Sequence, residues 1–130
     1  MAQNTIDLRQ DADYDMIINK SMDLDATITC QYYTGTTVND IVDFDFTNWT
    51  GSTLVVKQNY KHDNAILTFD TLDGSIVLGT TGGTFQLKKT STELSTLPIG
   101  EMVYTMWLRN ATYSHRAFLS GKFIIESVIV

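Results

Sequence analysis

Alternation of apolar and polar residues in many short stretches is the feature that most constrains this sequence. Val, Ile, Thr, Tyr and Phe dominate these stretches, and no stretch longer than about eight residues places apolar positions at helical spacing. Successive side chains of a strand point to opposite faces, so a period of two describes strands with one buried face. The sequence therefore predicts an all-β protein.

Turn signals separate the alternating stretches at short intervals. Thr-Gly, Asp-Gly and Gly-Gly pairs stand at 50–51, 73–74 and 82–83. Many short strands separated by turn residues at even intervals favour a sandwich or small barrel over βαβ units. A length of 130 residues suits a single domain. We expect strands at residues 14–19, 26–33, 38–46, 53–59, 65–70, 75–78, 84–88, 102–109 and 115–130.

Residues 90–97 depart from this pattern. Ser91-Thr92-Glu93-Leu94 predicts one helical turn that crosses between sheets, and Pro98 ends it. The strand expected at 102–109 is apolar on both faces, because Val103 and Trp107 point away from the more strongly apolar side. We expect this strand to be central and its second face to be covered, since exposed apolar patches are usually interaction sites.

The charge balance argues against nucleic acid and membranes as partners. Asp and Glu outnumber Lys and Arg 15 to 9, and the formal net charge is −6. A phosphate-binding surface needs clustered cations, and the apolar runs fall short of the roughly 20 residues of a membrane span. The first ten residues do not read as a secretory signal, so we expect a soluble protein made in a cytoplasm. Cys30, the single cysteine, is expected to be a buried apolar residue.

Short motifs along the chain carry a resemblance to a known family. They are IDLRQ at 6–10, FTNWTGSTLVVK at 46–57, LPIGEMVY at 97–104 and GKF at 121–123, which leads into the final strand. The pattern resembles the small immunoglobulin-like domains of tailed-phage virions, notably the N-terminal domain of the baseplate upper protein family. The chain departs from it in a longer connection at 23–45 and in a stretched Gly-x-Tyr element.

The resemblance implies an immunoglobulin-like β-sandwich of about seven to nine antiparallel strands with one short helical crossover. Residues 1–130 form the single domain, with residues 1–12 as a candidate N-terminal arm. Such domains anchor baseplate, fibre or ring components, or decorate heads, so the resemblance implies a place in the virion after synthesis in the host cytoplasm.

Three aspartates near the start imitate part of a calcium loop. Asp11, Asp13 and Asp15 alternate as its first ligands do, but Met16 and Met22 stand where the loop needs Gly and Glu. We expect a solvated strand edge there, and a looser calcium site remains the alternative.

Two further acids and two histidines are weak catalytic candidates. Asp43 and Asp45 would share one strand face about 7 Å apart, a spacing compatible with glycoside hydrolysis. However, nothing in the sequence marks a proton donor, and neither His62 nor His115 has a His or Cys at metal spacing. The sequence therefore predicts no enzyme, no cofactor and no metal.

Aromatic residues leave two uses open, a sugar-binding groove and interface anchors. Anchoring is the commoner use, and Trp49 and Tyr113, both beside turn residues, are expected to be exposed. We expect a structural or adaptor protein that assembles with itself and with other virion proteins through sheet edges and apolar patches. A carbohydrate-binding β-sandwich module is an alternative, and a small hydrolase is the weakest. The candidate interface residues are Trp49, Trp107, Tyr113, Ile124, Val128 and Val130.

Overall fold

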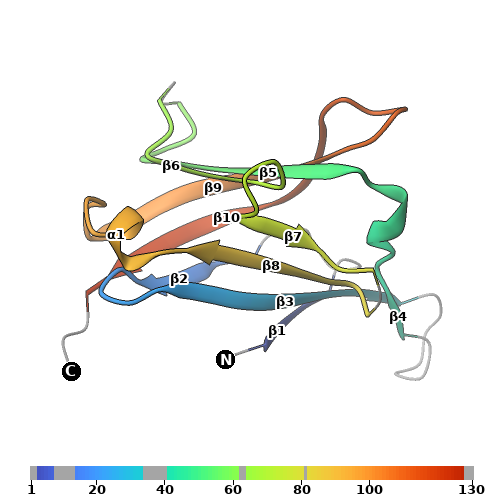
Figure 1. Cartoon of the computed structure of the whole chain (residues 1–130), viewed down its shortest axis with the longest axis horizontal. Coiled ribbons are helices and arrows are strands. Elements are labelled where there is room, and N and C mark those ends of the chain that lie inside the picture. Colours follow the sequence, from blue (N-terminus) through green and yellow to red (C-terminus); the bar gives the residue numbers. More distant parts are fainter. Residues whose placement is uncertain (1–2, 8–13, 34–40, 62–63, 81, 128–130) are drawn as a thin grey trace.

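The structure, a computed structural model, describes residues 3–7, 14–33, 41–61, 64–80 and 82–127. Two five-stranded sheets lie face to face as two layers (Figure 1). The predicted all-β sandwich is confirmed.

One layer, the β9 sheet, has the strand order β2-β10-β9-β5-β6. Its strand β9 lies between β10 and β5, so the expectation of a central strand is confirmed. The strands are β2 (Met16–Asn19), β10 (Arg116–Glu126), β9 (Gly100–Arg109), β5 (Gly51–Lys57) and β6 (Leu67–Asp70).

The other layer, the β3 sheet, has the strand order β1-β3-β8-β7, and β4 also pairs with β3. Gln31 pairs with both β1 and β4, so these two strands lie on opposite edges of β3. The strands are β1 (Gln3–Asp7), β3 (Leu24–Tyr33), β8 (Thr84–Lys89), β7 (Ile76–Leu78) and β4 (Ile41–Asp43).

Each predicted stretch contains a strand, but the purely antiparallel arrangement is wrong. β1 pairs with β3 in parallel, and β2 pairs with β10 in parallel. A parallel pair needs no tight turn between its strands, so no local signal announces it. For the same reason no signal in the sequence indicated β1, which lies within the N-terminal arm expected at residues 1–12. With β1, the structure describes ten strands.

The expected strand at 38–46 is shorter than predicted. β4 covers only Ile41–Asp43, and a single 3-10 turn, η1 (Phe46–Asn48), follows it. Asp45 caps this turn, because its side chain accepts a hydrogen bond from the backbone N–H of Thr47 at 2.9 Å. Capping competes locally with strand pairing, and Asp favours the cap. Residues 38–40 of the predicted strand lie outside the described residues.

The predicted helical turn is confirmed as α1 (Ser91–Leu94). Thr90 and Glu93 form a capping box, in which the Thr90 side chain accepts from the Glu93 N–H and the Glu93 side chain accepts from the Thr90 N–H. Leu94 is fully buried and fixes the turn to the core.

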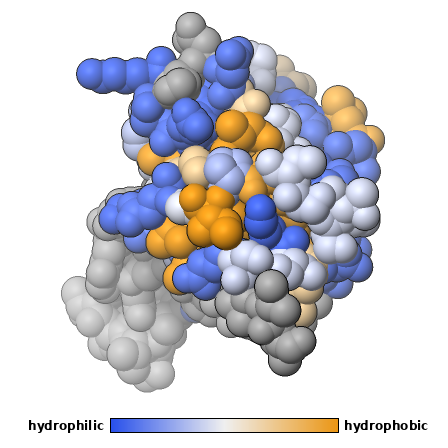
Figure 2. Space-filling model, turned by 90° about the vertical axis from the view of Figure 1, so that its left-hand side faces the viewer, coloured by the Kyte–Doolittle hydropathy of each residue, from blue (hydrophilic) through white to orange (hydrophobic). Residues whose placement is uncertain are grey.

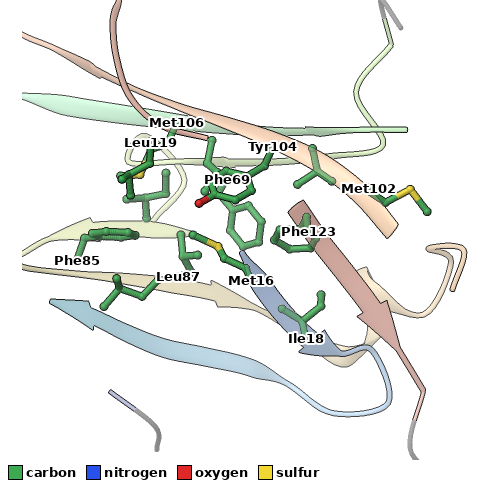
Figure 3. Close-up of a cluster of buried hydrophobic side chains, with 14 of the residues drawn as sticks. Met16, Ile18, Phe69, Phe85, Leu87, Met102, Tyr104, Met106, Leu119 and Phe123 are labelled. Atoms are coloured by element: carbon green, nitrogen blue, oxygen red, sulfur yellow. The ribbon is translucent and has the colours of Figure 1, made fainter. Parts of the chain in front are cut away.

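Apolar side chains of both sheets fill the space between the layers (Figure 3). On β9 the buried residues alternate as the sequence predicts, at Met102, Tyr104, Met106 and Leu108. Burying each such side chain contributes about 1.5–3 kcal/mol. Cys30 is also buried in this core as a free thiol, as expected. The contact between the two sheets is mainly apolar.

Candidate functional site

The outer face of the β9 sheet carries the side chains that alternate with the core. On β9 these are Val103, Thr105 and Trp107, which are half-buried. Val55 and Lys57 of β5 lie beside them in register, opposite Thr105 and Val103. This face therefore combines apolar, hydroxyl, aromatic and cationic groups on a rigid support.

Two loops rise above this face at opposite ends of the sheet (Figure 1). The β5–β6 connection carries Tyr60, and the β9–β10 connection carries His115. Between them lies an open groove of about 170 Å³, here called the β9 groove. Its side-chain walls are Val55, Lys57, Tyr60, Val103, Thr105 and Trp107.

Tyr60 covers one end of the groove. Its side chain is 59% exposed, and its hydroxyl lies 3.4 Å from the Gly121 carbonyl of β10, to which it donates a hydrogen bond. The Asn59 side chain accepts from the Lys61 N–H at 2.9 Å, and this contact fixes the loop around Tyr60. The phenol ring therefore leans over the sheet from a constrained loop.

Trp107 stands toward the other end of the groove. Its ring stacks on His115, with centroids 4.4 Å apart and an interplanar angle of 30°. A β-bulge in β10 between Ala117 and Leu119 lies opposite Trp107 in register. The stacking on His115 restrains the orientation of the indole.

A second aromatic cluster occupies the end of the sandwich near the β9–β10 connection. Trp49 and Tyr113 have ring centroids 6.0 Å apart, and the Arg116 guanidinium lies 4.9 Å from the Tyr113 centroid. The Asn110 side chain holds this loop by accepting from the Tyr113 N–H at 2.8 Å. Tyr113 is exposed, as expected, whereas Trp49 is half-buried because it packs against the core.

An ion-pair network lies next to Trp107 on the outer face of the β9 sheet. The Arg109 guanidinium donates to Asp70 at 3.0 Å and to the Thr53 hydroxyl at 2.9 Å. Burial opposes ionisation of Asp70, but hydrogen bonds from the Leu72 N–H and Thr53, together with Arg109, outweigh it and lower the pKa of Asp70. Asp70 is therefore held as a carboxylate that neutralises Arg109.

No family model matches the chain, and a search of curated proteins gave no significant match. Evidence on function comes instead from the arrangement of the side chains. In the described part of the chain no helix is long and apolar enough to cross a membrane.

The candidate interface residues do not form one site. Trp107 and Ile124 share the outer face of the β9 sheet, and Ile124 lies beside Ile17 of β2 in register. Trp49 and Tyr113 belong to the separate cluster described above, while Val128 and Val130 lie outside the described residues. Sequence reasoning missed Lys57 as a groove residue, and its position opposite Val103 follows only from strand register.

The two candidate catalytic acids line one small hollow of about 190 Å³. Asp43 accepts a hydrogen bond from the Gln31 amide at 3.0 Å, and Asp45 caps η1. The Thr47 hydroxyl and then its backbone N–H lower the pKa of Asp45. A general acid at neutral pH needs a raised pKa, so this environment disfavours Asp45 as a proton donor.

The calcium-like aspartates are only partly described. Asp15 accepts a hydrogen bond from the Lys122 backbone N–H at 3.0 Å, whereas Asp11 and Asp13 lie outside the described residues, as does His62. Among the described residues, no three or more His, Cys, Asp or Glu side chains are grouped to hold a metal ion.

Proposed function

We propose that this chain is a structural or adaptor domain of a tailed-phage virion that associates with copies of itself and with neighbouring virion proteins. The observation that carries the proposal is an exposed apolar side chain on an edge strand. Ile17 of β2 is 63% exposed. Edge strands that avoid association usually carry charged side chains or Pro, so Ile17 favours contact with another chain.

The backbone of β2 supports the same reading. Among the described strands, β2 has only β10 as a neighbour, and the register runs from Met16 opposite Phe123 to Asn19 opposite Glu126. A strand paired on one side presents backbone donors and acceptors on its other side. A strand from a second protein therefore has both hydrogen-bonding groups and an apolar side chain to bind.

Further exposed apolar side chains lie beyond β2, at the end of the sandwich that carries α1. Met22 in the β2–β3 turn is 58% exposed, and Ile99 in the α1–β9 loop is 64% exposed. Figure 2 views this end and shows apolar side chains near its centre, with hydrophilic ones among and beside them. Exposed apolar side chains gathered at one end of a molecule favour an interaction site there.

Two polar contacts hold the loops of this end together. The Lys20 ammonium donates to the Leu97 carbonyl at 2.7 Å, and the Asp23 side chain accepts from the Ser91 N–H at 2.7 Å. The loops are thus fixed to each other before any partner binds. Preorganised loops lose less conformational entropy on association, which favours a role as a docking surface.

The virion assignment rests on the motifs at 6–10, 46–57 and 97–104, which resemble those of phage baseplate domains. The β-sandwich fold agrees with this resemblance. Structural genes of phages are clustered, so the neighbours of this gene test the assignment. A position among capsid, tail or baseplate genes supports it, and a position among host metabolic genes contradicts it.

Light scattering coupled to size exclusion tests association. We expect the mass of the wild-type protein to rise with concentration and the variant Ile17→Lys to dissociate at least tenfold more readily, because a buried Ile contributes about 1.5–3 kcal/mol. Leu72→Lys is the matched control, since Leu72 is 87% exposed in the turn after β6, away from β2. A wild-type protein that stays monomeric at every concentration would refute self-association.

A further inference from the structure

We infer that the β9 groove binds an acidic saccharide, with Tyr60 and Trp107 as stacking surfaces and Lys57 as the partner of the acidic group. This inference goes beyond the proposed function. It concerns the outer face of the β9 sheet, whereas association is assigned to β2 and to the end of the sandwich that carries α1.

The shape of the groove suits a chain-like ligand. The groove is open, has a volume of about 170 Å³, and includes both Val103 and Trp107 of β9 in its walls. Four residues of strand correspond to about 13 Å. An extended oligosaccharide segment fits an open groove of this length better than a compact cofactor, which needs an enclosed pocket.

The two aromatic side chains offer faces for sugar rings. The C–H groups of a pyranose carry partial positive charge and pack against the negative face of an aromatic ring. Trp107 is already oriented by its stacking on His115, and Tyr60 is tethered to β10 through its hydroxyl. Because both rings are restrained, little conformational entropy is lost when a ligand binds.

One hydroxyl in the groove and one on the neighbouring strand suit the hydroxyls of a sugar. Thr105 of β9 lines the groove, and Ser120 of β10 lies opposite it in register. Within the described residues, neither side-chain hydroxyl makes a hydrogen bond to the protein. Such hydroxyls can donate to or accept from a sugar hydroxyl without breaking a contact of the fold.

The lysine in the groove indicates that the saccharide is acidic. Lys57 and Lys122 flank Val103 on the two neighbouring strands. Lys122 forms an ion pair with Glu101 at 3.5 Å, whereas Lys57 has no ion-pair partner among the described residues. Lys57 lines the groove and has no ion-pair partner among the described residues, so it favours a ligand that places a negative charge near its ammonium.

Single-stranded nucleic acid is the other ligand that combines stacking with charge. Its backbone carries one phosphate per nucleotide, and proteins bind it along a groove with several cations. Among its described lining residues, the β9 groove offers only Lys57 as a cation. A saccharide with a few acidic groups therefore fits the groove better.

A glycan array tests the inference. It carries glycans bearing uronate, sialate or sulfate groups beside their neutral counterparts. We expect the wild-type protein to bind acidic glycans at least tenfold more strongly than the neutral ones. Absence of binding to every acidic glycan, or equal binding to both sets, overturns the inference.

Variants assign the binding to the groove. Tyr60→Ala changes an exposed loop residue and is expected to weaken binding at least tenfold without affecting folding, and Trp107→Ala is expected to do the same. Lys57→Gln should remove the preference for acidic glycans. Tyr113→Ala, an exposed aromatic of the other cluster, is the matched control and should bind as the wild type does. Binding that survives both Tyr60→Ala and Trp107→Ala overturns the site.

The two tryptophans provide a test inside one molecule. In ¹H–¹⁵N spectra we expect a hyaluronan hexasaccharide to shift the indole signal of Trp107 and to leave that of Trp49 in place. If both or neither shift, the groove is not the site. Ile17→Lys should abolish association but keep glycan binding, so failure of this inference and failure of the proposed function are distinguishable.

Discussion

Replacement of Arg109 by Met should loosen the edge of the β9 sheet. The Arg109 guanidinium reaches from the end of β9 across β5, and it donates to Thr53 at 2.9 Å and to Asp70 and Thr71 at 3.0 Å each. Asp70 ends β6, which has only β5 as a neighbour among the described strands. Methionine keeps much of the apolar stem and removes the donors, so the variant isolates the polar contacts.

The size of the loss follows from exposure. Hydrogen bonds to charged groups contribute about 1.5–3 kcal/mol when buried, whereas exposed ion pairs contribute about 0.2–1 kcal/mol. The Arg109 and Asp70 side chains are 31% and 23% exposed, between these limits. We therefore expect Arg109→Met to lower the free energy of unfolding by about 1–2 kcal/mol, equivalent to roughly 4–8 °C in Tm.

Gly51 offers an independent way to disturb the same network. A Cβ added at Gly51 would lie 2.7 Å from the Arg109 guanidinium nitrogens, so Gly51→Ala should push the guanidinium away from its acceptors. Because both changes remove one set of contacts, the loss in the double variant should be smaller than the sum of the single losses.

Urea unfolding followed by circular dichroism measures these free energies. Arg116→Met is the matched control, because Arg116 is exposed and contacts only the Tyr113 ring among the described contacts. We expect it to change stability by less than about 0.5 kcal/mol. The reasoning is wrong if Arg109→Met costs no more than this control, or if Arg109→Met and Gly51→Ala are fully additive.

Three further predictions concern the hydrophobic core, the Cys30 thiol and the loss of stability at low pH. Phe123→Ala should lower the free energy of unfolding by about 3–5 kcal/mol, measured in urea, because Phe123 is 0% exposed between the two sheets. Burial raises the pKa of Cys30 to about 12, so Ellman's reagent at pH 8 should label it only after unfolding, and rapid labelling of the folded protein would contradict this. The lowered pKa of Asp70 stabilises the fold above the unfolded-state value of roughly 3.9, and this contribution is lost as the pH falls through the folded-state pKa. The stability difference between wild type and Asp70→Asn should therefore be larger at pH 7 than at pH 2.5, and an equal difference would contradict the assignment.

Local signals in the sequence predicted elements well where each element depends on neighbouring residues. The capping box at Thr90 and Glu93 follows from residues three positions apart. The glycine turn at 82–83 joins β7 to β8, and at Gly83 a Cβ would lie only 2.6 Å from the Cys30 carbonyl. Asp45 is the contrary case, because capping and strand pairing compete for it and the alternation of its neighbours favoured the wrong outcome.

The candidate site was less predictable. Trp107 was expected on the second face of a central strand, and it lies there. The approach of Tyr60 to Gly121 joins residues 61 positions apart, and the position of Lys57 depends on the register between β5 and β9. No pattern within one segment encodes such contacts.

By itself the sequence determined the class of the fold and the buried face of most strands, because a strand's two faces alternate and the apolar face must leave water. Only the tertiary structure decided which strands pair, including the parallel pairs β1–β3 and β2–β10. It also decided that Tyr60, Trp107 and Lys57 line one groove. The strands that pair are far apart in the chain, so their pairing depends on how the whole sandwich packs.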